Sequence, residues 1–455
     1  MIFEVPLLIA VLFALASAVV MRAKDARLAR QQGLGAAATA AAIAGVAFVG
    51  KATQGTWGTW GTWATAEMAS WLPGGLLAIA PLVTGLVALL AIGLAPLVEH
   101  RKSTFARMLL LFGFAEGFLA TSHPLPLAVL WAASAAVTWV EFRSWCGEEG
   151  WPRVFGVYQL VSVLFFSAGA LMIGQGMHTT TASIVLLVGI GIREGVVPVH
   201  SWFVRFVERA PMGVVVAFVA PQLGVYAQLE LLSGGGLGEI APTVAAFGAI
   251  TAVLAAMLGV VQTNARRAVA YLILSQTGLV AFGLESHSEV GLVGALLNWQ
   301  VLALATSGLV MTLAALEARR GRRSLIRPQG SFSETPKLGV AFLVLGFASV
   351  GFPLTLGFVA EDLLVQGSVS EFPVLGLSLV VATAINGVTV LRAFFYLLMG
   401  EKKGSGAPDL CRREASILGL IVVILVTFGL VPSILVSFES PVDGPQSGGR
   451  LEGEK

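Results

Sequence analysis

The sequence predicts an all-α polytopic membrane protein with about fourteen transmembrane helices. Three observations support this class. The chain of 455 residues is 56% hydrophobic and only 12% charged, whereas soluble proteins carry about 25% charged residues. Many of its apolar runs approach or exceed the roughly 20 residues that a helix needs to cross a bilayer. Most of its charged residues collect in short segments between these runs. Helices are the expected spanning elements, because the runs are too long and too continuously apolar for barrel strands.

The apolar runs define the expected spans in chain order. They cover residues 2–22, 33–50, 73–97, 105–122, 124–142, 156–176, 181–198, 211–232, 239–262, 267–285, 290–316, 336–365, 372–399 and 415–437. The first run has Glu4 before it and basic residues after it, which is the wrong charge order for a signal peptide, so a retained helix is expected. The 53 glycines favour close contacts between helices in lipid.

Basic residues mark one side of this arrangement. They follow the first, third, eleventh and thirteenth spans, all on the same side of the membrane when fourteen spans are counted. These residues are Arg22, Lys24, Arg27, Arg30, Arg101, Lys102, Arg107, Arg319, Arg320, Arg322, Arg323, Arg327, Lys402, Lys403, Arg412 and Arg413. The positive-inside rule then places these loops in the cytoplasm and both termini outside. Arg266 and Arg267, at the start of the tenth span, are expected to face the lipid headgroups.

Several function classes find no support in the composition. A net charge of +2 gives no indication of nucleic-acid binding. Cys146 and Cys411 are too few for a disulfide framework and belong to no CxxC or Cys/His cluster, so no metal, haem or iron–sulfur cofactor is expected. No serine or cysteine has a paired base at a defined spacing, so we expect no catalytic site in this chain.

Ionisable and amide side chains inside the expected spans are the candidate functional residues. A charge at the bilayer centre costs roughly 2.5–3.5 kcal/mol on insertion scales, so such groups indicate function or a paired structural role. The candidates for an ion path or for coupling are Glu116, Arg193, Glu194, His200, Gln222, Glu361 and Asp362. Helix-breaking residues lie beside two groups of them: Pro198 beside the first, and Gly351, Pro353 and Gly357 beside the second.

Two interpretations of these charges stay open. Interrupted helices in two separated segments indicate an ion or substrate path in a repeat-built transporter, so Arg193 is a candidate working charge at a helix break. The alternative is a structural ion pair between Arg193 and Glu194 or Glu116 that holds two helices together. Glu361 and Asp362 lie near the end of a span, where contact with water is the simpler interpretation.

Four segments resemble a known family. They are GIREGVVPVHSWFVRFVERAP (191–211), QTNARRAVAYLILSQTG (262–278), GFPLTLGFVAEDLL (351–364) and LRAFFYLLMGE (391–401). Their order and spacing, from about residue 95 to about residue 400, resemble the antiporter-like membrane subunits of respiratory complex I and the related Mrp antiporters. The resemblance implies two inverted five-helix repeats, each with one broken helix, and a chain of lysines, histidines and a glutamate that relays protons along the membrane midplane.

The resemblance also implies a domain plan. It has N-terminal helices (1–104), a first repeat (105–262), a second repeat (263–400) and a C-terminal helix with its preceding loop (401–437). The last residues (438–455) are polar and contain Pro and Gly, so their composition predicts a disordered tail. A bacterial inner membrane is the implied location.

The relay residues of the family are mostly replaced here. Arg193 stands at the lysine of the first break, and His200 matches a family histidine. At the second break Glu361 stands at a lysine and Asp362 at an aspartate. Ala132 follows Trp131 where the family has a glutamate. The positions that match the family's other histidines and lysine are Gln222, Asn298, Leu302 and Thr306. An arginine is a poor proton-relay group because its pKa exceeds about 12, so this pattern questions a continuous relay while the fold stays expected.

Two functions from different classes follow, and both stay open. The first is a membrane subunit of a multi-subunit complex that carries or couples to proton or other cation movement. Its expected partners are lipid and other subunits, either redox subunits of the NADH-quinone oxidoreductase type or the large soluble zinc protein of inorganic-carbon uptake systems. The second is a membrane scaffold that keeps the fold, lacks the relay and anchors a catalytic or transporting partner. A third hypothesis is that the protein is an unrelated secondary transporter.

Overall fold

The computed structural model describes residues 4–54, 74–147, 150–177, 179–232, 237–286, 288–401, 406 and 408–432. Its helices are α1 (Glu4–Met21), α2 (Ala26–Gln54), α4 (Gly74–Leu94), α5 (Lys102–Leu119), α6 (Pro124–Cys146), α7 (Trp151–Gly174), α8 (Thr180–Glu194), α9 (Ser201–Arg209), α10 (Met212–Val219), α11 (Leu223–Leu232), η1 (Gly238–Ile240), α12 (Ala241–Val260), α13 (Ala265–Gly283), α14 (Glu289–Val301), η2 (Leu302–Thr306), α15 (Ser307–Arg320), α16 (Pro336–Ala348), α17 (Leu356–Glu371), α18 (Pro373–Leu398) and α19 (Arg412–Leu430). These residues contain no strand beyond one isolated bridge between Asn264 and Ser324, so the predicted all-α class is confirmed.

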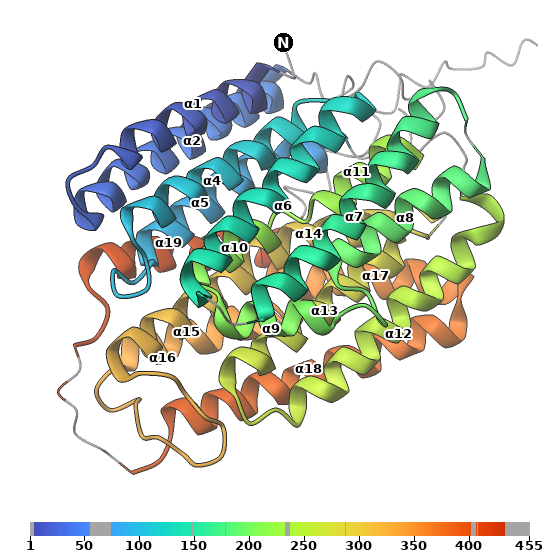
Figure 1. Ribbon diagram of the computed structural model, residues 1–455. Helices are drawn as coiled ribbons and strands as arrows, with labels where there is room; N and C mark the ends of the chain where they lie inside the picture. Colours follow the sequence, from blue (N-terminus) through green and yellow to red (C-terminus); the bar gives the residue numbers. More distant parts are fainter. Residues whose placement is uncertain are drawn as a thin grey trace, which may run out of the picture.

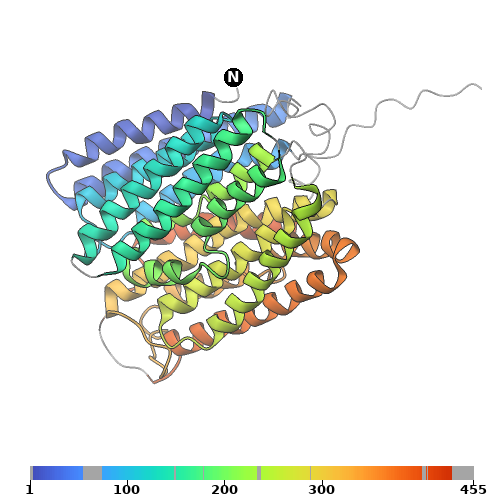
Figure 2. The ribbon, with the colours of Figure 1, turned by 45° about the vertical axis from the view of Figure 1, so that its right-hand side comes forward.

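The helices lie side by side in one tilted bundle, with α1 and α2 at one edge and α12 and α18 at the opposite edge (Figures 1 and 2). Within the described part of the chain, ten helices are long and apolar enough to cross a membrane. The predicted number of fourteen is therefore not confirmed. α5 carries three charged residues, and α8, α16 and α17 have only 15, 13 and 16 residues.

The surface of the bundle is apolar where a soluble protein would be polar. On α1, Leu7, Leu8, Leu15 and Val19 are each more than half exposed. Lipid chains are the environment in which such a surface is stable, because they are as apolar as leucine. The buried interior lies around α10, α13 and α15.

Small residues bring helix backbones into contact, as the glycine content predicts. Gly169 on α7 faces the backbone of Leu186 on α8, and Gly189 on α8 faces Phe166 on α7. Any side chain at these two positions would meet backbone atoms, which cannot move independently of their helix. The α7–α8 contact therefore depends on glycine.

We expect Gly169→Ala to lower the stability of the folded protein by about 1–3 kcal/mol, the usual cost of overpacking. The added Cβ would lie 2.6 Å from the Leu186 backbone nitrogen, so α7 and α8 must separate. Unfolding by SDS titration in mixed micelles measures the change. Gly387→Ala in α18 is the matched control, because nothing lies within 4 Å of its added Cβ, and it is expected to leave stability unchanged or slightly raised.

Two helices are broken where the sequence predicts. The first break separates α8 from α9: Gly195 ends α8 in the left-handed conformation (φ 75°), and the Val197–Pro198 peptide bond is cis. The second separates α16 from α17, with Gly351 (φ 64°) and Leu354 (φ 76°) in the connection. Pro353 lies in this second connection, and Gly357 stands in the first turn of α17.

Two further interruptions were not predicted. The expected span 211–232 is divided into α10 and α11 by residues 220–222, where Gln222 takes a positive φ of 39°. Pro221, which has no backbone N–H, is the sequence signal that could have indicated this break. The expected span 290–316 contains a π-helical segment, η2, between α14 and α15. The sequence of η2, LALAT (302–306), contains no residue that predicts the change from α- to π-helix.

The basic loops lie together on one face, which we call the basic face. Lys102 Nζ donates to the carbonyl of Ala23 at 3.3 Å, and Arg319 pairs with Glu414 at 2.6 Å. Arg266 at the start of α13 joins the two groups through Glu99 and through Glu317 on α15, each at 2.6 Å. The predicted gathering of basic loops on one side is thus supported by contacts between them.

Arg266 does not face headgroups, contrary to expectation. Its side chain is 1% exposed and reaches Glu99 and Glu317, each at 2.6 Å, and the carbonyl of Ala210 at 2.9 Å. Its neighbour Arg267 remains about one-third exposed. Asn264 caps α13 by accepting from both backbone nitrogens, and the helix then turns the two side chains to different sides.

The expected disordered tail, 438–455, lies outside the residues that the structure describes. The domain boundaries also stay predictions. We note that α12, which lies within the predicted first repeat, packs mainly on α13 and α18 of the second.

Candidate functional site

Arg193 lies at the end of α8, buried between two aromatic rings. Its guanidinium carbon is 4.5 Å from the ring centre of Trp131 on α6 and 4.3 Å from that of Phe218 on α10. Nη1 also donates to the Trp131 carbonyl at 3.4 Å. Trp131 is itself stacked on Phe166 with centroids 4.1 Å apart. Among the ion pairs formed by the described residues, none involves Arg193. The aromatic rings therefore hold this cation.

We expect Arg193→Gln to lower the stability of the folded protein by about 1–4 kcal/mol, because two ring contacts worth roughly 0.5–2 kcal/mol each are lost. SDS titration of the purified protein measures the loss. Arg143, whose guanidinium lies 5.4 Å from the Trp139 ring on the exposed side of α6, provides the control. Arg143→Gln should change stability by less than about 1 kcal/mol. Equal effects of the two substitutions would contradict the assignment.

Glu194 points away from these rings towards α11. Its Oε1 accepts from the backbone N–H of Gly224, 3.1 Å away, in the first turn of α11. The first turn of a helix presents free N–H groups and a positive dipole end, which stabilise a carboxylate. The break between α10 and α11 creates this helix start, and Trp299 holds it by donating to the carbonyl of Pro221 at 3.2 Å.

A cavity lies between α8, α11 and α13, next to Glu194. Its polar lining residues are Glu194, Gln222, Thr277 and Gln228, and its volume is about 40 Å³. That is room for at least one water. Gln222 Nε2 donates to Thr277 Oγ1 at 2.8 Å, while its buried Oε1 has no protein donor. We call this space the α8–α11–α13 cavity.

Three consecutive polar residues on α13 connect the two halves of the bundle. Thr277 faces Gln222, and Gln276 Nε2 donates to Glu361 Oε1 on α17 at 3.2 Å. Ser275 donates to the carbonyl of Ala252 on α12 at 2.8 Å. Asn298 and Asn386, on α14 and α18, donate to Gln276 and Ser275. A polar connection thus runs from the first helix break to the second through α13.

Glu361 and Asp362 have opposite surroundings although they are neighbours. Glu361 is buried, and its carboxyl lies against Gly351 in the second break, where a side chain larger than hydrogen would collide with it. Asp362 is exposed and accepts from Gln366 at 2.7 Å, one turn along α17. The structure brings Glu361 to the polar connection and leaves Asp362 on the surface.

Glu116 and His200 stand apart from the polar connection. Glu116 lies fully buried in α5, and both of its oxygens lack a hydrogen-bond donor. It makes no ion pair with Arg193, so the expected role as counter-ion is not supported by a contact. His200 lies half-buried in the first break, with its ring 6.3 Å from that of Tyr271.

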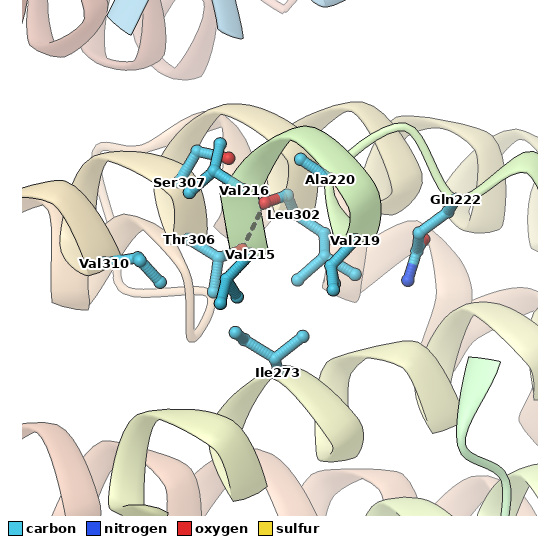
Figure 3. A pocket seen from close by; sticks show the side chains of 10 residues that line it. All are labelled: Val215, Val216, Val219, Ala220, Gln222, Ile273, Leu302, Thr306, Ser307 and Val310. Atoms are coloured by element: carbon cyan, nitrogen blue, oxygen red, sulfur yellow. Dashed lines mark hydrogen bonds between the residues drawn. The ribbon is translucent and has the colours of Figure 1, made fainter. Parts of the chain in front are cut away.

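A second cavity lies between α10, α13 and η2 (Figure 3). None of its lining side chains is of a type that exchanges protons near neutral pH. Val215, Val219 and Ile273 point into it, and its polar side chains are those of Gln222, Thr306 and Ser307. The Thr306 hydroxyl bonds the Leu302 carbonyl within η2.

Residues 154–386, about half of the chain, match the family described as the transmembrane part of NADH:quinone oxidoreductase and Mrp antiporter proteins. The chain belongs to this family. Both broken helices and α13 lie inside the matched region. The resemblance expected from the four segments is confirmed.

The relatives carry names from both branches of the family. One is mnhD2 of Staphylococcus aureus strain Mu3, which carries the name of an antiporter subunit; it is 25% identical over 306 residues, covering 64% of this chain and 61% of its own. Another is NADH-quinone oxidoreductase subunit M of Rickettsia prowazekii, 24% identical over 267 residues, covering 57% of this chain and 54% of its own. The chain thus spans less than two thirds of these relatives' length.

Solved structures share the fold over nearly the whole chain. The Mrp complex from Dietzia sp. DQ12-45-1b contains a chain with a TM-score of 0.81 and 18% identity, covering 96% of each chain. Respiratory complex I from Thermus thermophilus contains one with a TM-score of 0.78 and 20% identity, covering 96% of this chain and 97% of that one. At these identities the likeness shows the fold alone.

Proposed function

We propose that this chain is a membrane subunit of a multi-subunit complex and couples that complex to proton movement. The observation that carries the proposal is the polar connection from Glu194 to Glu361. Glu194 and Gln222 line one cavity, Gln222 bonds Thr277, and Gln276, next to Thr277 in the sequence, bonds Glu361. Buried polar groups inside a membrane bundle are costly, so a connected set of them between two helix breaks indicates an ion path.

We assign the following roles under this proposal. Glu194 and Glu361 are the groups that gain and lose protons, because each is a carboxyl at a helix break. Arg193 is a fixed cation that favours the ionised form of Glu194 beside it. Gln222, Thr277 and Gln276 orient water but cannot titrate. His200 is a further polar group at the first break. Glu116 is a buried carboxyl outside the polar connection. Asp362 contacts Gln366 on the surface of α17. The first helix is kept broken by Pro198. The second is kept broken by Gly351, Pro353 and Gly357.

The proposed setting is a bacterial inner membrane with the basic face in the cytoplasm. The partners are other subunits of the complex and lipid. The domain plan with two inverted repeats, about fourteen spans and both termini outside belongs to the same proposal.

The experiment is co-purification followed by transport. The tagged chain is extracted in a mild detergent, its partners are identified by mass spectrometry, and the intact assembly is reconstituted into vesicles that contain a pH dye. A potassium diffusion potential then drives proton uptake. Redox subunits would identify a redox-driven pump, and a large soluble zinc protein would identify an inorganic-carbon uptake system. Absence of any partner, or absence of proton uptake by the assembly, would contradict the proposal.

A membrane scaffold is the second candidate, and one observation favours it. The cavity between α10, α13 and η2 contains no titratable side chain among its lining residues, at the place where the family is expected to relay protons. The scaffold predicts that the partners co-purify while the assembly moves no protons, and that Glu194→Gln leaves the partner's activity unchanged.

A further inference from the structure

The polar connection has a side branch that leaves it at the first helix break. Gln228 lines the α8–α11–α13 cavity, and its Nε2 donates to Glu285 Oε1 at 2.6 Å. Glu285 follows the end of α13, whereas Arg266 on the basic face stands near its start. Glu285 therefore lies at the face opposite the basic loops.

We propose that Glu194 and Glu285 are the inner and outer carboxyls of a short proton branch through the α8–α11–α13 cavity. The branch opens the first helix break to the face opposite the basic loops, and protons that move along α13 to or from Glu361 enter or leave through it. This inference rests on the proposed function, because it gives the same protons their access to one face.

The cavity reaches from the first helix break to Gln228. Gln222, just before α11, and Gln228, within it, both line the cavity, and Glu285 is reached through the hydrogen bond from Gln228. No hydrogen bond joins Glu194 and Glu285 in the described part of the chain, so water must carry the proton between them. Glu194, Gln222, Thr277 and Gln228 supply the two to four polar partners that a buried water needs.

Two unsatisfied acceptors mark the ends of the water path. The Oε1 atom of Gln222 and the Oε2 atom of Glu285 are buried and accept no hydrogen bond from the protein. Gln222 is 2% exposed and Glu285 3% exposed. Unpaired buried acceptors are costly, and bound water or a proton on the carboxyl satisfies them.

The proton balance requires only water. Protonated Glu194 gives its proton to the nearest cavity water, each water passes a different proton to the next, and the last water gives a proton to the Glu285 carboxylate, so that every O–H bond that forms is matched by one that breaks. Glu194 is left ionised beside Arg193 and the Gly224 N–H, Glu285 is left neutral, and no electron is transferred.

The electrostatic surroundings suit this exchange. Burial raises the pKa of Glu285 to about 7, although the Gln228 hydrogen bond opposes the shift. The other charged groups on the elements that pack here are Arg193 on α8, Glu230 on α11 and Glu371 on α17. The hydroxyl of Ser286, next to Glu285, donates to Glu371 at 3.2 Å and continues the polar surface outward.

Proton uptake by vesicles that contain the intact assembly tests the branch. We expect Glu285→Gln to lower the uptake rate at least tenfold, as Glu194→Gln does, and the double variant to be no worse than either. Ala281→Leu fills the cavity while both carboxyls remain, and the same loss is expected. Glu289→Gln, an exposed carboxylate at the start of α14, is the matched control and should match wild type.

The outcomes separate this inference from the proposed function. Wild-type rates in Glu285→Gln, with uptake lost in Glu194→Gln, would overturn the branch and leave the proposed function standing. An assembly that takes up no protons would overturn both. If Glu285→Gln does not fold, Ala281→Leu decides.

Infrared spectroscopy adds a readout that does not depend on transport. We expect a carboxyl C=O band that titrates near neutral pH and is absent from Glu285→Gln but present in Glu289→Gln. Persistence of the band in Glu285→Gln would assign it to another carboxyl and remove Glu285 from the branch.

Discussion

Replacing Arg266 by alanine is expected to destabilise the folded protein by about 3–5 kcal/mol, the usual cost of breaking a buried ion pair from one side. Its guanidinium is 2.6 Å from both Glu99 and Glu317, and Glu317 is 6% exposed. Without the arginine, two carboxylates are left without their cation in a largely dry site. The loss is measured by SDS titration in mixed micelles and by the fraction that elutes as a single species in size exclusion.

Arg267→Ala is the matched control one residue along. Arg267 pairs with Glu208 at 2.9 Å, but about a third of its side chain is exposed, so the change should cost less than about 1 kcal/mol. A double variant that removes both charges, Arg266→Met with Glu317→Gln, should recover part of the loss, because one stranded carboxylate is gone. Similar effects of Arg266→Ala and Arg267→Ala would contradict the buried-pair assignment.

These two arginines show which features of the structure can be predicted from the sequence alone and which cannot. Composition and the spacing of apolar runs were sufficient for the fold class, since the bilayer imposes its length on every span. Which side of a helix meets the core depends on its neighbours in space. Arg266 is buried because Glu99, in the connection between α4 and α5, and Glu317 on α15, both distant in sequence, lie beside it.

The same limit applies to the candidate site. The two predicted breaks carry a local signal, because glycine and proline restrict or free the backbone at those residues. The π-helical segment η2 has none, since its residues are ordinary helix formers. A carboxylate partner is one of the two interpretations of Arg193 that the sequence leaves open, yet Trp131 and Phe218, distant from it in sequence, surround its charge. Gln228 and Glu285 meet only because α11 and the end of α13 converge.

Glu361→Gln is expected to lower proton uptake by the intact assembly at least tenfold, since the amide keeps the size of the side chain but cannot take up a proton. Its Oε1 accepts from Gln276 at 3.2 Å, and its carboxyl fills the space beside Gly351 in the second break. An amide oxygen can still accept the Gln276 bond, so folding should be little affected. The measurement is the initial rate of uptake in vesicles, together with SDS titration of the same preparation.

Asp362→Asn is the control for this substitution, because the two carboxyls are adjacent in sequence and opposite in environment. Asp362 is exposed and, among the described residues, accepts a hydrogen bond from Gln366 on its own helix, so uptake should stay within about twofold of wild type. A tenfold loss at Asp362 with normal uptake at Glu361 would move the path to the surface of α17. Equal, normal uptake in both variants would remove the second break from the path and leave the Glu194 side as its only titrating end. Burial decides between these outcomes, because burial disfavours the charged form of a carboxyl and favours the form that carries a proton.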